Sequence, residues 1–246
     1  MRRDCVTKTK VSESDIKMVE KLTSFILIAD SPNPRMRSYG PTSLLNIKES
    51  RLIDIQVSEI IKYFKNYEII LCTGFEADKI TRYIKTKYKD INIRTVENQQ
   101  FEETNSCETL RLALNNINND HVFILDGNLI FDGEILINNI NKPYILFEPE
   151  NKTLEIGINI NERGYTEYMG YGASNYWSEI IYLNDANVIN SLSRHLSVNN
   201  FKRKFIFEAI NSLIGSRLNL TAIKNDKSVY KILGVKYYHK IKGNKK

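Results

Sequence analysis

The sequence predicts an α/β fold, a three-layer sandwich around a mostly parallel central sheet. Short apolar runs suited to buried strands alternate with helical segments of about ten to fifteen residues. The first of these runs is residues 25–29, Phe-Ile-Leu-Ile-Ala. A chain of 246 residues, 42% of them hydrophobic, can also bury one good core. We therefore expect one domain wound by right-handed crossovers.

The first half of the chain supplies the parallel part of this sheet. Each apolar run is followed by a segment of helical pattern, so successive strands are expected to lie parallel. Strands are predicted at 25–29, 68–72, 91–96 and 121–125, and helices at about 51–65, 76–88 and 105–117.

The second half predicts an antiparallel addition. Residues 144–147 and 154–158 are expected to form an additional antiparallel strand pair. Further strands are expected at 167–172 and 177–183.

The termini differ in composition from this central part. Residues 1–23 are predicted to be an N-terminal extension with a short helix, because Ser12 to Asp15 form a capping signal before an apolar pattern. That helix is expected to pack on its own domain or to dock on a partner. Residues 24–241 form the single domain, and residues 242–246 are a basic tail.

Composition excludes several classes of protein. No stretch approaches the roughly twenty apolar residues of a membrane span, and no apolar signal-peptide core follows Met1. Three scattered cysteines do not predict a disulfide framework or a zinc site. The net charge of +6 comes partly from basic termini, which we interpret as solvated rather than as a nucleic-acid site. We expect a cytoplasmic protein without membrane contact.

The abundance of Lys, Ile and Asn suggests an AT-rich coding genome, such as a phage, a virus or a low-GC bacterium. A viral protein would lie in the virion or the host cytoplasm.

The loop after the first strand carries the most informative motif. It resembles the opening motif of sugar-nucleotide pyrophosphorylases and phosphocholine cytidylyltransferases, roughly Leu-Ala-Ala-Gly-x-Gly-x-Arg-Met and then Pro-Lys-x-Leu. The positions that match are Ala29, Arg35, Met36, Pro41 and Leu44. The resemblance implies a Rossmann-like, GT-A-type fold, nucleotide contacts from this loop, and Arg35 on a triphosphate.

The same loop departs from the family at its phosphate-handling positions. Asp30 or Ser31, and Asn33, stand where the family has glycines, and Thr42 stands where it has lysine. Those glycines let backbone N–H groups approach a triphosphate, and the lysine neutralises it. A carboxylate at Asp30 would repel phosphate if the loop bent toward one.

Two further segments resemble nucleotide-binding parts of the family. Thr73-Gly74 follows the second strand as in the family's Val-Thr-Gly-Tyr turn, although an ordinary strand-to-helix turn accounts for it. Residues 101–110 are similar to the Tyr-x-x-Thr-Asn-Asn-x-x-Ser-Leu segment of the phosphocholine branch. Asn105 and Ser106 are therefore expected at a helix N-terminus near the nucleotide base, a place that also suits a simple cap.

Transfer of a nucleotidyl group joins two anions, so the resemblance implies Mg²⁺ as the cofactor of an active enzyme. Residues 121–132 resemble the family's Glu-Gly-Asp-Val-Val-Phe strand end, but Asn128 holds the place of the metal-binding aspartate. Asp126 lies two residues earlier, on the same face of an extended segment, and is the alternative ligand. Near the C-terminus, Glu208 lies on a helix like one in the family, and Gly234 falls where the second aspartate belongs.

The resemblance implies that the acceptor of such a reaction lies at the antiparallel strands. Tyr171, Tyr176 and Trp177 could form an aromatic box there for a choline-like cation, although aromatic residues in strands more often belong to the core.

Two functions remain open from the sequence. The first is a nucleotidyltransferase-like protein with impaired catalysis that serves as a binding or assembly component, with further copies or another protein as partner. The second is an active Mg²⁺-dependent enzyme that transfers a nucleotidyl group from a nucleoside triphosphate to a sugar phosphate or phosphocholine-like acceptor. In that enzyme Arg35, Asp126 and Glu208 would be the catalytic residues.

Overall fold

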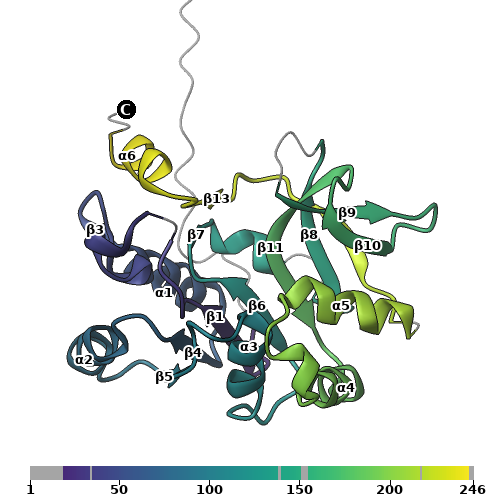
Figure 1. The fold of residues 1–246 in the computed structure, drawn as a ribbon, viewed down its shortest axis with the longest axis horizontal. Helices are drawn as coiled ribbons and strands as arrows, with labels where there is room; N and C mark the ends of the chain where they lie inside the picture. Colours follow the sequence, from purple (N-terminus) through teal and green to yellow (C-terminus); the bar gives the residue numbers. More distant parts are fainter. Residues whose placement is uncertain (1–18, 34, 138–139, 151–154, 217, 244–246) are drawn as a thin grey trace, which may run out of the picture.

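A computed structural model of the chain describes residues 19–33, 35–137, 140–150, 155–216 and 218–243 (Figure 1). Within these residues, nine strands form one mixed sheet with helices on both faces. The predicted α/β class, with a largely parallel sheet and an antiparallel portion, is confirmed.

The parallel part of the sheet follows the order β5-β4-β1-β6. Its strands and the helices between them lie within a few residues of the predicted ranges, because each combines an apolar run with a polar boundary. They are β1 (Thr23–Ile28), α1 (Leu52–Tyr63), β4 (Tyr67–Thr73), α2 (Ala77–Lys87), β5 (Ile93–Glu97), α3 (Ser106–Leu114) and β6 (Val122–Asp126).

The antiparallel part is organised around β11 (Asn175–Leu183), which pairs with β6. The predicted pair of residues 144–147 and 154–158 is wrong, because β8 (Tyr144–Glu148) and β9 (Ile156–Ile160) each pair with β11. Residue 154 lies outside the described residues. The long β11 offers hydrogen-bonding groups that two short strands share, and local sequence does not reveal such non-local pairing. The outer strands are β10 (Thr166–Tyr171), paired with β9, and β12 (Thr221–Lys224), parallel to β8.

Side chains alternate between the two faces of the sheet and build two cores. On one face, Phe25 and Leu27 pack with α1 and α2. On the other face, Ile26 packs with α3, α4 (Ala186–Leu196) and α5 (Ile206–Gly215), which Figure 1 shows together beside the green strands. This arrangement is the predicted three-layer sandwich.

A third, smaller apolar cluster joins the C-terminal segment to the loop after β1. It includes Met36, Leu45 and Leu52 from the first part of the chain, and Ile232 and Tyr238 from the last. The hydroxyl of Tyr238 donates to the backbone oxygen of Asn46 at 3.1 Å. The short elements around this cluster are β2 (Asn46–Ile47), β3 (Ser50–Arg51), β7 (Leu129–Ile130), β13 (Tyr230–Lys231), α6 (Val235–Gly243) and the 3₁₀ turns Arg37–Tyr39 and Thr42–Leu44. Further 3₁₀ turns lie at Gly133–Leu136 and Asn199–Phe201.

The end of the predicted N-terminal extension packs against the domain. Val19 is buried, and its backbone forms hydrogen bonds with Tyr63, the last residue of α1, and with Lys65. The predicted helix in residues 1–18 and the tail residues 244–246 lie outside the described residues, so the domain boundaries stay a prediction. No helix in the described part of the chain is long and apolar enough to span a membrane.

Candidate active site

A cavity of about 260 Å³ opens at the carboxyl ends of the central strands. The chain leaves β1 toward β4 and later returns to β6 on the other side of β1, so the strand order reverses between β1 and β6. Ligands of open α/β sheets bind at such a reversal, outside the carboxyl ends of the strands. Among the predicted site residues, the cavity is lined by Asp30, Ser31, Asn105, Ser106, Asp126, Asn128, Tyr171 and Trp177.

Two carboxylates reach this cavity from neighbouring parallel strands. Asp126 is paired in register with Ile28, and Asp30 follows two residues later in the chain. The hydroxyl of Thr109 donates to Asp30, and Asn98 donates to that hydroxyl at 2.9 Å. Burial raises the pKa of Asp30 despite these hydrogen bonds.

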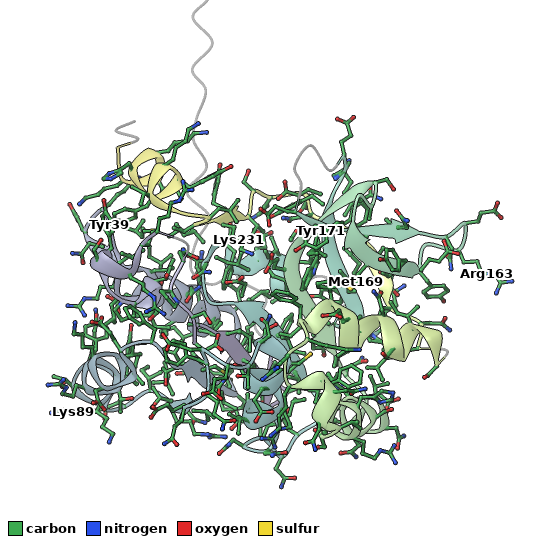
Figure 2. All side chains as sticks on the ribbon, viewed as in Figure 1. Tyr39, Lys89, Arg163, Met169, Tyr171 and Lys231 are labelled. Carbon is green, nitrogen blue, oxygen red and sulfur yellow. The ribbon has the colours of Figure 1, made fainter. Side chains whose placement is uncertain are left out.

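Asp126 belongs to a buried group of three charged side chains. The ammonium of Lys231 lies 3.1 Å from a carboxylate oxygen of Asp126 and also bonds to Glu179. The side chains are only 14 to 19% exposed. Figure 2 labels Lys231 beside the C-terminal segment. This trio places two acids and one base in the lining of the cavity.

Backbone geometry aims Glu179 at Asp126. In the antiparallel register Ile180 lies opposite Leu125, so Glu179 follows beside Asp126. The pairing of β11 with β8 is irregular between Trp177 and Ile181, and Glu179 has a positive φ of 58° there. A left-handed backbone is uncommon for a residue other than glycine and costs on the order of 1 kcal/mol. The backbone at this bulge is therefore strained, and the bulge directs the carboxylate of Glu179 into the cavity.

The pKa values of Asp126, Glu179 and Lys231 are shifted in different ways. Burial alone would raise the pKa of Asp126, but the charge of Lys231 and several hydrogen bonds bring it below its ordinary value. Burial and the charge of Asp126 raise the pKa of Glu179. Burial would lower the pKa of Lys231, but the two carboxylates raise it instead. The negative charge of the trio is therefore held by Asp126 in preference to Glu179, next to the ammonium of Lys231.

Asn128 is held by a chain of hydrogen bonds that involve amide groups. Its side-chain nitrogen donates to Asn33 at 2.9 Å, and the side chain of Asn33 donates to the backbone oxygen of Ile232. The backbone nitrogen of Asn128 donates to Asp126 at 2.8 Å. Within the described residues the side-chain oxygen of Asn128 is buried without a hydrogen-bond partner. The loop after β1, the turn after β6 and β13 are thus tied together at the cavity edge.

Aromatic side chains line the outer part of the cavity. Phe205 stacks on Phe207, with ring centroids 5.9 Å apart, and Tyr171 meets Phe207 edge-on. Trp177 also lines the cavity and is buried. Tyr176, the third residue of the predicted aromatic box, is half-buried and does not line the cavity.

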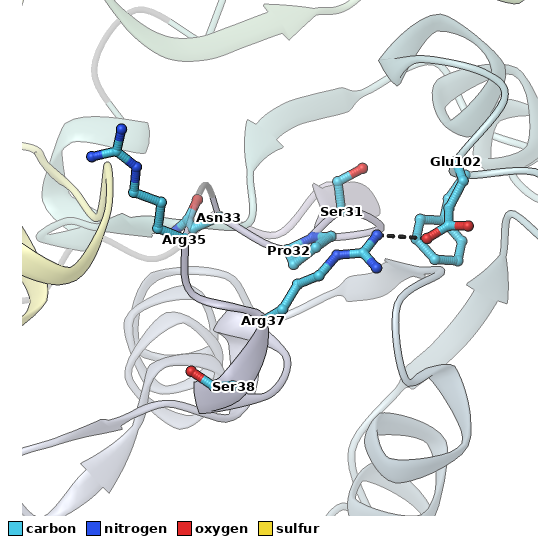
Figure 3. A pocket seen from close by; sticks show the side chains of 8 residues that line it. Ser31, Pro32, Asn33, Arg35, Arg37, Ser38 and Glu102 are labelled. Carbon is cyan, nitrogen blue, oxygen red and sulfur yellow. Dashed lines mark hydrogen bonds and ion pairs between the residues drawn. The ribbon is translucent and has the colours of Figure 1, made fainter.

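Arg35 lies in a neighbouring surface depression, which Ser31, Pro32, Asn33 and Arg37 also line. In Figure 3 its side chain points away from Pro32 and Arg37. Arg37 instead pairs with Glu102, as the dashed line in Figure 3 shows. The predicted triphosphate-binding arginine is therefore not among the residues that line the cavity of Asp126.

The other predicted residues have local structural contacts. The carboxylate of Glu208 accepts the backbone N–H of Phe205 at 2.8 Å and caps α5. Gly74 packs so closely on the backbone of Asp30 that a Cβ would come within 2.6 Å of its oxygen. The remaining predicted residues, Ala29, Thr42 and Thr73, are buried and do not line the cavity.

The donor groups do not suit the Mg²⁺ that the resemblance implies. One oxygen of Asp126 accepts a backbone N–H and the other faces Lys231. Across the described residues, no group of three or more His, Cys, Asp and Glu side chains is placed to hold a metal ion. Mg²⁺ needs several oxygen ligands in near-octahedral geometry, and an ammonium already occupies the oxygen-rich point of this cavity.

The lining of the cavity also includes residues that were not predicted from the sequence, among them the charged and aromatic residues Glu155, Glu179, Phe205, Phe207 and Lys231. Glu179 is a charged residue within the otherwise mostly apolar strand segment Trp177–Leu183. This charge was the one available signal that the strand approaches a polar site. Nothing near Lys231 in the sequence indicates that it pairs with residues about 50 and 100 positions earlier.

Gly127, between Asp126 and Asn128, offers a test of how tightly the cavity edge is packed. A Cβ at this position would lie 2.5 Å from Cβ of Ala29 and 2.8 Å from the backbone oxygen of Ile28. Gly127→Ala should therefore cost about 1–3 kcal/mol in the free energy of unfolding, measured by urea denaturation. Gly215→Ala is the matched control, because the structure has open space there. Equal stability of the two variants would contradict the close approach.

Comparisons with known proteins bear on the fold. No protein-family model matches the sequence, and no match was found among curated proteins. The fold is similar to CTP:phosphocholine cytidylyltransferase from Streptococcus pneumoniae, with a TM-score of 0.71 and 17% identity over 90% of this chain and 98% of that one. It is also similar to a nucleoside-diphosphate-sugar pyrophosphorylase from Vibrio cholerae RC9, with a TM-score of 0.72 and 12% identity over 90% and 100%. A UDP-glucose pyrophosphorylase complexed with UDP-glucose matches with a TM-score of 0.70 and 12% identity over 91% and 98%. The chain therefore has the nucleotidyltransferase fold.

Proposed function

We propose, from this fold and cavity, that the chain is a small-molecule-binding protein in which nucleotidyl transfer is impaired. One observation carries the proposal. The cavity is formed where this fold is expected to bind its ligand, but Lys231 is paired with Asp126 inside it. The binding site is thus retained while the metal-dependent part of the chemistry is replaced.

The catalytic residues expected from the sequence support impaired transfer. Glu208 caps a helix, Arg35 lines a separate depression, and Asn128 carries an amide where a metal aspartate would be expected. Each group removed from phosphate or metal handling costs about 2–4 kcal/mol of transition-state stabilisation, so the combined loss spans many powers of ten in rate.

The proposed ligand is a nucleoside triphosphate or a related nucleotide. Its base would lie near Asn105 and Ser106, which line the cavity from the N-terminus of α3. The ring faces of Tyr171 and Trp177 would contact the far end of the ligand, where a choline-like cation could pack on them. If the protein has an assembly role, further copies of the chain or another protein would be the partner.

Isothermal titration with CTP, UTP, dTTP, ATP and GTP, each with and without Mg²⁺, tests this proposal. We expect one nucleotide to bind equally well in both conditions, without release of pyrophosphate when an acceptor is added. Phe205→Ala should weaken that binding, because Phe205 lines the cavity and is 47% exposed. Tyr237→Ala, at an aromatic residue that is 46% exposed on α6, is the control. A folded protein that binds none of the five would contradict the proposal.

An active enzyme is the alternative, and the open cavity is the observation that favours it. Asp126, Asn105 and Ser106 all reach this cavity, as the sequence predicts for an enzyme of this fold. In that case pyrophosphate release with phosphocholine or a sugar phosphate would require Mg²⁺, and nucleotide affinity would fall with EDTA. Those two results together would favour the enzyme over the impaired protein.

A further inference from the structure

We infer that the ammonium of Lys231 is the resident cation of this cavity, held between Asp126 and Glu179, and that the site consequently takes no divalent metal ion. The inference concerns the charge balance of the protein alone. It therefore holds whether or not the proposed nucleotide binds.

The contacts of Lys231 are those of a cation in a site of low accessibility. Its Nζ lies 3.1 Å from Oδ2 of Asp126 and bonds to Oε1 of Glu179. The side chain of Lys231 is 16% exposed, and all three residues line the same cavity. A buried carboxylate needs a nearby positive charge or hydrogen-bond donors, and here the chain supplies both itself.

The backbone holds Lys231 in place. β13 pairs antiparallel with β7, which sets Lys231 opposite Leu129. The next residue, Ile232, donates its N–H to the backbone oxygen of Asn128 at 3.0 Å and accepts the side chain of Asn33. Lys231 is thus built into the wall of the cavity and differs from a mobile surface lysine.

The carboxylate of Asp126 is already engaged through both of its oxygen atoms. Oδ1 of Asp126 accepts the backbone N–H of Asn128, and Oδ2 faces the ammonium. The nitrogen of the Asn128 side chain is committed to Asn33. A divalent ion close to Asp126 would also lie within a few ångströms of the ammonium, where like charges repel.

The inference predicts that changing the charge of residue 231 changes the metal response. In Lys231→Glu, three carboxylates would converge where the ammonium was, which is the donor type that Mn²⁺ and Mg²⁺ prefer. Lys231→Gln removes the ammonium without adding a third carboxylate and offers a milder version of the same change. Lys236→Glu makes the same charge change at an exposed position on α6 and is the matched control.

The experiment is a thermal-unfolding titration of the four proteins with Mn²⁺ and Mg²⁺ against EDTA, without nucleotide. We expect the midpoint of the unmodified protein and of Lys236→Glu to be insensitive to metal. The midpoint of Lys231→Glu should rise by about 3–6 °C when the metal concentration reaches about ten times its dissociation constant. Lys231→Gln should respond in the same direction by a smaller amount.

Metal-dependent stabilisation of the unmodified protein that exceeds the response of Lys236→Glu would overturn the inference. A folded Lys231→Glu without any metal response would also count against it. If Lys231→Glu does not fold even with Mn²⁺, the comparison of the unmodified protein with Lys231→Gln decides. Nucleotide affinity is measured separately, so failure of the proposed function would leave this result unchanged.

Discussion

Lys231→Met should destabilise the protein by about 3–5 kcal/mol at neutral pH. The substitution keeps most of the apolar stem but leaves Asp126 next to Glu179 in a cavity without its ammonium. Removing one partner of a buried ion pair is strongly destabilising, because the remaining charge has lost the hydration that it has in the unfolded chain. Urea denaturation gives the difference in the free energy of unfolding directly.

Lys227→Met is the matched control for that result. Lys227 also contacts two carboxylates, Asp132 at 3.0 Å and Glu134, but its side chain is 34% exposed. An exposed pair contributes about 0–1 kcal/mol, so this variant should lose much less stability. Adding Asp126→Asn and Glu179→Gln to Lys231→Met should recover part of the loss, since no buried charge would remain. Equal losses in Lys231→Met and Lys227→Met would show that the cavity is more hydrated than the structure indicates.

Phe123→Ala should cost a further large amount, about 3–5 kcal/mol. Phe123 is fully buried on β6 and stacks parallel on Phe25 with ring centroids 5.1 Å apart. Its ring also packs against the rings of Phe64 and Tyr182, with centroids 5.8 Å and 4.5 Å away. Truncation would leave a cavity among rigid rings and break the contact between adjacent strands and α1.

The expected consequence is a fall in the unfolding midpoint of about 2–4 °C for each kcal/mol lost, measured by calorimetry. Phe205→Ala serves as the control, because it removes the same side chain from a position that is 47% exposed. A midpoint within about 2 °C of the unmodified protein for Phe123→Ala would be incompatible with the packing of this aromatic cluster.

The layered architecture follows from local patterns in the sequence. The run Phe25–Ile28 alternates between two cores, and the helix Leu52–Tyr63 shows the spacing of a helix packed on one face. Such patterns depend on residues that are near one another in the chain, so the sequence alone reveals them. The strand partners of 144–147 and 154–158 were predicted wrongly, because strand pairing depends on distant residues.

The sequence by itself determined the α/β class and the order of the parallel strands and helices along the chain, and it has Asn128 and Thr42 where the resemblance implies an aspartate and a lysine. Only the tertiary structure decided which side chains meet at the cavity. It joined Glu179 and Lys231 to Asp126 across more than fifty residues of chain, through the bulge in β11 and the pairing of β13 with β7. Secondary structure records interactions between near neighbours, whereas the charge balance of a cavity arises from side chains that meet only after the chain has folded.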